Sequence, residues 1–81
     1  MNFKKRLGPA PAARATACYA TFGCPDIWEL ADGDFAIIGA NITASAAPLL
    51  PPSAGCAPDE AIIRIPRQLL VLAKRDIPET V

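Results

Sequence analysis

The chain has 81 residues, which is enough for one small domain and no more. A chain of this length buries only about 60% of its unfolded surface, so it usually needs a disulfide, a metal ion or a second subunit for stability. Its formal net charge is zero, which excludes a global field that would attract nucleic acid or an anionic membrane.

Residues 1–17 are predicted to form a flexible basic segment, and residues 18–81 a single small domain. Pro9 and Pro11 oppose a helix in the first segment, and it has no apolar periodicity. Its Lys and Arg side chains would give at most weak, salt-sensitive contacts with nucleic acid.

Export is considered because Lys4-Lys5-Arg6 and Ala15-Thr16-Ala17-Cys18 imitate the two ends of a lipoprotein signal. Gly8, Arg14 and the prolines interrupt the apolar run that such a signal needs between them. No stretch approaches the roughly 20 apolar residues of a membrane span. We therefore expect a cytoplasmic chain without a membrane partner, and an exported or lipid-anchored protein remains an alternative.

A short edge strand is possible over residues 18–22, and a hairpin is predicted over residues 27–39. The hairpin signal is Asp32-Gly33 between two apolar runs, because both positions of a two-residue turn need positive φ. This turn would place Leu30 opposite Phe35 and Trp28 opposite Ile37, with all four side chains on one face. The other face would hold Ile27, Ala36 and Ile38. A short helix over residues 25–30 is the alternative, because Pro25 could open it and Gly33 could follow its end.

The second half of the chain is predicted to add one strand and two helical segments. Asn41 or Thr43 could cap a helical turn over residues 44–50, which Pro51 ends. Residues 61–65 are predicted to be the third strand of the sheet. Residues 66–75 are predicted to be a C-terminal helix, because apolar residues recur there at helical spacing: Pro66, Leu69, Leu70 and Ala73. The fold class is thus α+β, with a small three-stranded antiparallel sheet; a strand over residues 69–72 would instead give an all-β small barrel.

Catalysis is not expected from this chain. It contains no histidine, which removes the commonest general base and the commonest metal ligand. Gly-rich phosphate-binding loops of either standard spacing are also missing from the sequence. We expect neither a cofactor nor a small-molecule substrate.

The three cysteines, Cys18, Cys24 and Cys56, are an odd number, and free thiols in a reducing cytosol are the simplest interpretation. One disulfide with a spare thiol is the next interpretation. The alternative is a thiol-based metal-binding or redox-sensing domain, with Asp26 or Asp59 as a fourth metal ligand. The spacing does not favour metal, because such sites usually contain Cys-x₂-Cys pairs.

A protein partner is the favoured function, because the predicted sheet is apolar on both faces and one short helix covers only one of them. The second face needs either the 44–50 segment or another subunit. Trp28 is a suitable anchor, since it offers a large area and a polar N–H. The expected interaction residues are Trp28, Ile27, Ile38, Ile62, Arg64 and Arg67. They predict a non-catalytic protein-binding or regulatory accessory subunit, with a homodimer as one form.

Three segments resemble a small family of uncharacterised proteins from high-GC actinobacteria. They are residues 24–39 (CPDIWELADGDFAIIG), residues 55–60 (GCAPDE) and residues 63–67 (IRIPR). Members of this family are often encoded near helix-turn-helix regulators, so the resemblance implies an accessory or regulatory role in the bacterial cytoplasm. The family offers no established active site to carry over.

Overall fold

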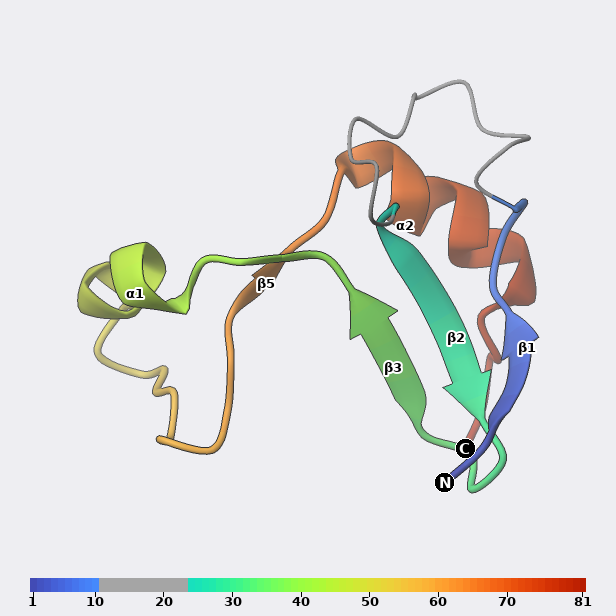
Figure 1. Ribbon diagram of the computed structural model, residues 1–81, viewed down its shortest axis with the longest axis horizontal. Coiled ribbons are helices and arrows are strands. Elements are labelled where there is room, and N and C mark those ends of the chain that lie inside the picture. The colour runs from blue at the N-terminus through green and yellow to red at the C-terminus, as the bar shows by residue number, and fades with distance from the viewer. Residues whose placement is uncertain (11–23) are drawn as a thin grey trace.

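The computed structural model describes residues 1–10 and 24–81, and it has the predicted α+β fold. The main sheet is antiparallel in the order β1 (Phe3–Arg6), β2 (Asp26–Leu30) and β3 (Phe35–Ile38), as Figure 1 shows. A second, two-stranded sheet pairs β4 (Ala40–Asn41) with β5 (Ile63–Arg64). The helices are α1 (Thr43–Ala46) and α2 (Arg67–Ala73), and each runs on into a 3-10 turn, η2 (Ala47–Leu49) and η3 (Lys74–Asp76).

The hairpin is confirmed, but its predicted register is wrong by one residue. Leu30 N–H donates to Asp34 O at 2.8 Å and Gly33 N–H donates to Leu30 O at 3.0 Å, so the loop has three residues, 31–33. Gly33 adopts φ +97°, which is typical of the last position of such a loop. Trp28 therefore pairs with Ala36, and Ile27 pairs with Ile37.

The extra loop residue changes which side chains share a face. Ile27, Ile37 and Phe35 now lie on one face of the sheet, and Trp28 and Ala36 lie on the other. The helical alternative for residues 25–30 is wrong, because these residues contain strand β2.

The third strand of the main sheet is β1, and not the predicted strand at residues 61–65. β1 comes from the segment that was predicted to be flexible, and it pairs with β2 through Lys5↔Glu29 and Arg6↔Trp28. A bulge between Phe3 and Lys5 breaks the alternation that would have marked this strand in the sequence. The predicted strand exists in part as β5, but its partner is β4.

The C-terminal helix is confirmed, and no barrel closes. Leu69 and Ala73 are buried on its inner side, while Leu70 of the same predicted stripe is 52% exposed. The predicted turn over residues 44–50 is present as α1 and η2. The predicted cap at Asn41 or Thr43 is wrong, because Ile42 is the N-cap and has no side-chain cap hydrogen bond. Asn41 lies one residue earlier, and its Oδ1 accepts hydrogen bonds from Thr43 N–H at 3.1 Å and from Thr43 Oγ1 at 2.7 Å. The possible edge strand at residues 18–22 lies outside the described residues.

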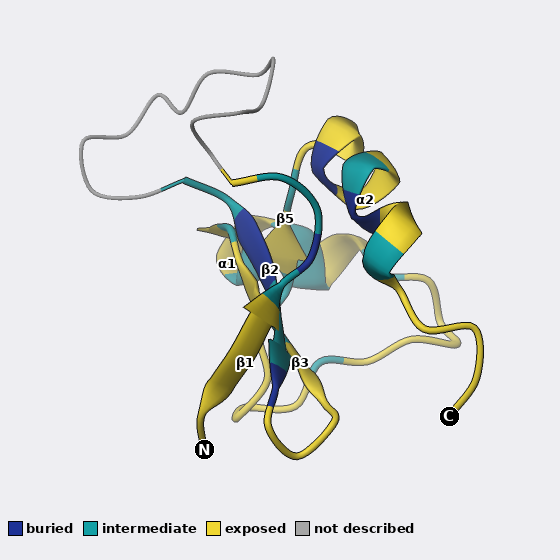
Figure 2. Ribbon diagram, turned by 90° about the vertical axis from the view of Figure 1, so that its right-hand side faces the viewer, coloured by how far each residue is buried: buried dark blue, intermediate teal, exposed yellow. Residues whose placement is uncertain are grey.

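The hydrophobic core lies between one face of the sheet and α2. It contains Leu7, Ile27, Leu69 and Ala73, each at most 4% exposed, with Ile65 packed against them. Figure 2 shows that the buried residues gather on β2 and on the side of α2 that faces it. Since Leu7 directly follows β1, the N-terminal strand is part of the body that surrounds this core.

Candidate interaction surface

An apolar groove lies beside the core, between β3 and α2. It has a volume of about 180 Å³, and only apolar residues line it: Leu7, Ile27, Phe35, Ile37, Leu70 and Ile77. Small-molecule sites usually enclose about 300–1,000 Å³ and carry a few polar groups that orient the ligand. The size and lining of the groove therefore suit an apolar side chain of another protein better than a metabolite.

The groove stays open because α2 is too short to cover β3. Its seven residues place Leu69 and Ala73 over Ile27, but the face of β3 remains in part uncovered. Four lining residues are between 42% and 52% exposed, namely Phe35, Ile37, Leu70 and Ile77. Each of them would lose water-exposed apolar area in contact with a partner, which is the main favourable term in protein association.

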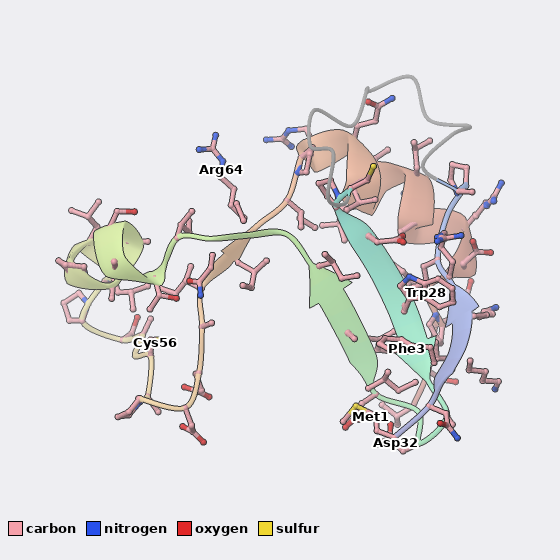
Figure 3. All side chains as sticks on the ribbon, in the orientation of Figure 1. Met1, Phe3, Trp28, Asp32, Cys56 and Arg64 are labelled. Carbon is pink, nitrogen blue, oxygen red and sulfur yellow. The ribbon has the colours of Figure 1, made fainter. Side chains whose placement is uncertain are left out.

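The opposite face of the sheet is covered in part by a cluster of side chains around Asp26. Arg6 Nε lies 3.0 Å and 3.1 Å from the two carboxylate oxygens of Asp26, and Trp28 Nε1 donates to Asp26 Oδ2 at 2.9 Å. The Arg6 guanidinium lies 4.6 Å from the centre of the Trp28 ring. Phe3 meets the same ring edge to face, with the ring centres 5.7 Å apart, and Figure 3 shows the two side by side. This cluster covers part of the outer face of the sheet, while Ile38 on the same face remains 50% exposed.

The N-terminal strand is also joined to the end of η3. Gly8 N–H donates to Asp76 Oδ2 at 2.7 Å. This hydrogen bond is the main cause that lowers the pKa of Asp76 below its usual value of 3.8. Burial raises the pKa and so opposes this effect. A hydrogen bond from Arg75 and the positive charges of Arg75 and Lys5 lower the pKa further. The ionised carboxylate thus connects two segments that are 68 residues apart.

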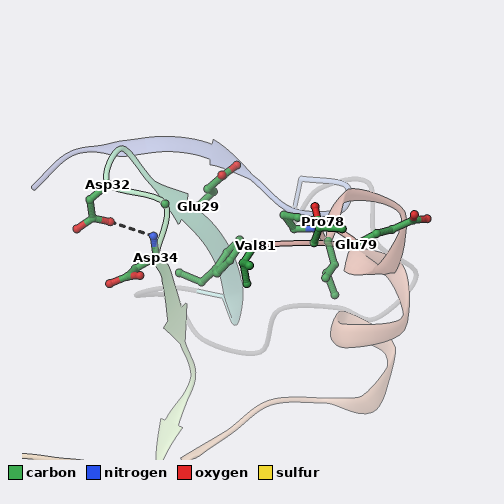
Figure 4. A pocket seen from close by; sticks show the side chains of 10 residues that line it. Glu29, Asp32, Asp34, Pro78, Glu79 and Val81 are labelled. Carbon is green, nitrogen blue, oxygen red and sulfur yellow. Dashed lines mark hydrogen bonds between the residues drawn. The ribbon is translucent and has the colours of Figure 1, made fainter.

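An acidic hollow of about 810 Å³ lies at the hairpin turn, beside the last residues of the chain (Figure 4). Glu29, Asp32, Asp34 and Glu79 are among its lining residues. Asp32 Oδ1 accepts a hydrogen bond from the N–H of Asp34, at 3.0 Å. Among residues 1–10 and 24–81, no group of three His, Cys, Asp or Glu side chains is placed to hold a metal ion.

The cysteines do not form the expected set of free thiols. Cys24 is disulfide-bonded, whereas Cys56 is a free thiol whose Sγ lies 3.8 Å from Ala57 O. This corrects the expectation of free thiols and agrees with the alternative of one disulfide and a spare thiol. Cys18 lies outside the described residues. A disulfide sulfur is not the thiolate that zinc requires, so Cys24 in this state does not serve the alternative metal site.

A side lobe, formed by residues 40–64, extends away from the sheet and α2 (Figure 1). It contains β4, α1, η2 and β5, and none of its residues is buried. Leu49 in η2 is 82% exposed. The β4–β5 pairing joins the two sides of the lobe, and beyond it Ile42 N–H donates to Ile62 O and Ile62 N–H donates to Thr43 Oγ1.

The six residues expected to interact are not brought together. Ile27 is 4% exposed and belongs to the core, and Trp28 is held in the cluster with Arg6. Ile38 is 50% exposed but lies at the β3 end, on the face away from the groove. Ile62 and Arg64 lie in the side lobe, with the Arg64 side chain pointing away from the sheet in Figure 3, and Arg67 is exposed at the start of α2.

The groove residues that the sequence did not identify are Phe35, Ile37, Leu70 and Ile77. The signal was present for Phe35 and Ile37, since a three-residue loop ending at Gly33 would have placed them opposite Glu29 and Ile27. The helical stripe predicted that Leu70 faces the sheet together with Leu69. It could not show that Leu70 stays half exposed at the groove.

Within the described residues, no helix has the length and apolar character needed to cross a bilayer.

Comparisons with known proteins found no relative of this chain. No family model matches it, and no curated protein or solved structure is significantly similar to it.

Proposed function

We propose that this chain is a non-catalytic accessory subunit that binds another protein through the apolar groove. The observation that carries the proposal is the set of half-exposed apolar side chains around one hollow, on β3 and on the α2–η3 segment. Contiguous exposed apolar surface in a small protein is typical of an interaction site. A regulatory role is proposed only from the resemblance to proteins encoded near helix-turn-helix regulators.

The test is the size of the chain in an extract of cells that produce it. We expect the wild type to elute well above its 8.5 kDa monomer mass, and Ile37→Asp to elute as a monomer, because a carboxylate in the groove opposes contact with an apolar partner. Val71→Asp is the matched control, since Val71 is 60% exposed on α2 and does not line the groove. A wild type that elutes at the monomer mass would contradict the proposal.

We also propose that the chain keeps its N-terminal residues and acts in the cytoplasm. Leu7 is 1% exposed in the core and β1 is part of the main sheet, so cleavage after residue 17 would remove both. This speaks against an exported lipoprotein, although a disulfide is unusual in a reducing compartment. The intact mass of the native protein decides the point: the full 81-residue mass agrees with the proposal, and loss of residues 1–17 contradicts it.

A redox-sensing role is a second candidate, favoured by the disulfide of Cys24. Cys24 lies two residues before Asp26, whose carboxylate holds Arg6 and Trp28, so reduction is expected to loosen the start of β2. The test compares partner binding with and without dithiothreitol, with Cys24→Ser as the control that mimics the reduced state. Equal binding under all three conditions would reject a redox role.

A further inference from the structure

The side lobe has no core of its own. Its helix α1 has four residues, its strands have two residues each, and no residue from 40 to 64 is buried. An isolated helix shorter than about 12 residues is marginal in water, and a two-stranded ribbon is marginal as well. Contacts outside the lobe are therefore needed to hold it in one conformation.

The stretch that begins at β3 and continues through most of the lobe has no charged residue; the last part of the lobe carries Asp59, Glu60 and Arg64. Residues 35–58 contain no Asp, Glu, Lys or Arg, which makes them the longest uncharged run in the sequence, at 24 residues. A solvated protein surface usually has about 25–35% charged residues. Since most of this run is exposed, its composition is that of a surface that another chain covers.

The lack of charge favours a second copy of the chain as that cover. In a two-fold dimer both protomers contribute the same surface to the interface, so an interface surface with one charge sign would repel its copy. The other candidate surfaces carry such charge: Lys4 and Lys5 lie on the β1 edge of the sheet, and Asp32 and Asp34 lie at the hairpin turn. β3, the other edge strand, has only uncharged residues and lacks the lysines that protect a free edge.

The lobe and the groove are complementary, and they do not meet within one chain. The groove is lined by residues in or next to β1, β2, β3, α2 and η3, and no residue of the lobe is among them. Leu49, at the far end of the lobe, is the most exposed leucine of the described residues at 82%. The groove has an apolar lining, and Leu49 is an exposed apolar side chain of a size that such a groove can take.

We propose that two copies of this chain form a two-fold dimer in which the side lobe of each protomer packs its Leu49 into the apolar groove of the other. This inference rests on the proposed function, because it names the protein that the groove binds. Two such contacts are made at once, and each lobe gains the support that its own protomer does not supply. The dimer is thus expected to order residues 40–64 as well as to cover Ile37 and Leu70.

The first test is the molar mass of the purified full-length chain, measured by light scattering over a range of concentrations. We expect twice the 8.5 kDa chain mass, and a weakening of the dimer by about 30-fold or more in Leu49→Asp and in Ile37→Arg. Val71→Asp is expected to remain dimeric. Cys56→Ser is the control for an artificial dimer linked through the free thiol.

The second test mixes the two defective variants. A heterodimer of Leu49→Asp with Ile37→Arg has one unchanged lobe-to-groove contact and one contact in which Asp faces Arg. The mixture is therefore expected to recover the dimer that neither variant forms alone. If Ile37→Arg fails to fold by circular dichroism, Leu70→Arg takes its place in the groove.

Any result other than a dimer that the mixture restores overturns the inference. A purified chain that is monomeric at every concentration excludes the dimer; if the chain is still large in the cell extract, the groove binds a different protein and the proposed function stands. A dimer that the mixture fails to restore, or that Val71→Asp disrupts equally, is built from surfaces other than lobe and groove.

Discussion

Asp26 is the residue on which the outer face of the sheet depends. It is 5% exposed, and its carboxylate accepts hydrogen bonds from Arg6, from the Trp28 indole and from the Ile27 N–H. Such a carboxylate stabilises the fold only while its partners are present, because an unpaired buried charge is costly. In the sequence, Asp26 was a candidate metal ligand beside Cys24; the structure gives it the different role of joining β1 to β2.

Removing this carboxylate is expected to destabilise the chain strongly. Asp26→Ala should lower the free energy of unfolding by about 2–3 kcal/mol, because it leaves a half-buried guanidinium and the indole N–H without their acceptor. Asp26→Asn should cost less, since its amide oxygen still accepts one hydrogen bond. Urea unfolding followed by the fluorescence of the single tryptophan measures both. Asp59→Asn, in an exposed loop, is the control and should change stability by less than about 0.5 kcal/mol; equal effects at both positions would contradict this role of Asp26.

The stability of the chain is expected to depend on Asp76 at acid pH. The hydrogen bond from Gly8 lowers the pKa of Asp76 below 3.8 in the folded state, so folding favours its ionised form. This contribution is fully present above the unfolded-state pKa and is lost as the pH falls through the lower folded-state pKa. Wild type should therefore be more stable than Asp76→Asn at pH 7, and the difference should shrink towards pH 2. A difference that does not vary with pH would reject this linkage.

At the scale of the elements, the hairpin shows how one loop residue decides which side chains form the core. Asp32-Gly33 predicted the turn and its place, but a two-residue and a three-residue loop share this signal. The longer loop turns Ile27 towards α2 and leaves Trp28 to the outer face. β1 could not be predicted, because its sequence FKKR is charged and its bulge removes the period-two pattern.

The loop can be tested with two glycines whose added Cβ would meet no atom within 4 Å. Gly33 has φ +97°, whereas no such positive φ is found at Gly55. Gly33→Ala is expected to cost about 1–2 kcal/mol, because an L-residue is strained in that conformation. Gly55→Ala should be neutral within about 0.5 kcal/mol in the same urea titration. A neutral Gly33→Ala would mean that the hairpin closes through a different loop.

Two neighbouring leucines of α2 separate stability from binding. Leu69→Ala should destabilise the chain by about 2–4 kcal/mol, because Leu69 is 4% exposed and its removal leaves a cavity in the core. Leu70→Ala removes a side chain that is 52% exposed, so its cost should stay below about 1 kcal/mol while association weakens. Urea unfolding and molar mass are measured on the same two samples. If Leu70→Ala is as unstable as Leu69→Ala, Leu70 belongs to the core and not to a binding surface.

At the scale of the whole molecule, the sequence predicted the fold class, the hairpin, the C-terminal helix and an excess of apolar surface. It did not locate that surface, because this required the loop length, the pairing of β1 and the reach of α2. The excess was expected on a face formed by Ile27, Ala36 and Ile38, but the changed register puts Ile27 in the core and Ala36 and Ile38 on the face of Trp28. The excess lies instead in the groove and the side lobe, where the longest uncharged run of the chain is exposed.

The central claim is that another polypeptide covers the apolar groove, and site-specific photo-crosslinking in living cells tests it most directly. A benzophenone amino acid placed at Ile37 should give a defined covalent adduct, whereas the same group at Val71 on the exposed side of α2 should give none. An adduct of twice the chain mass would identify a second copy, and any other defined mass would identify a different protein. If Ile37 yields no more adduct than Val71, the groove is open to water and the account is contradicted.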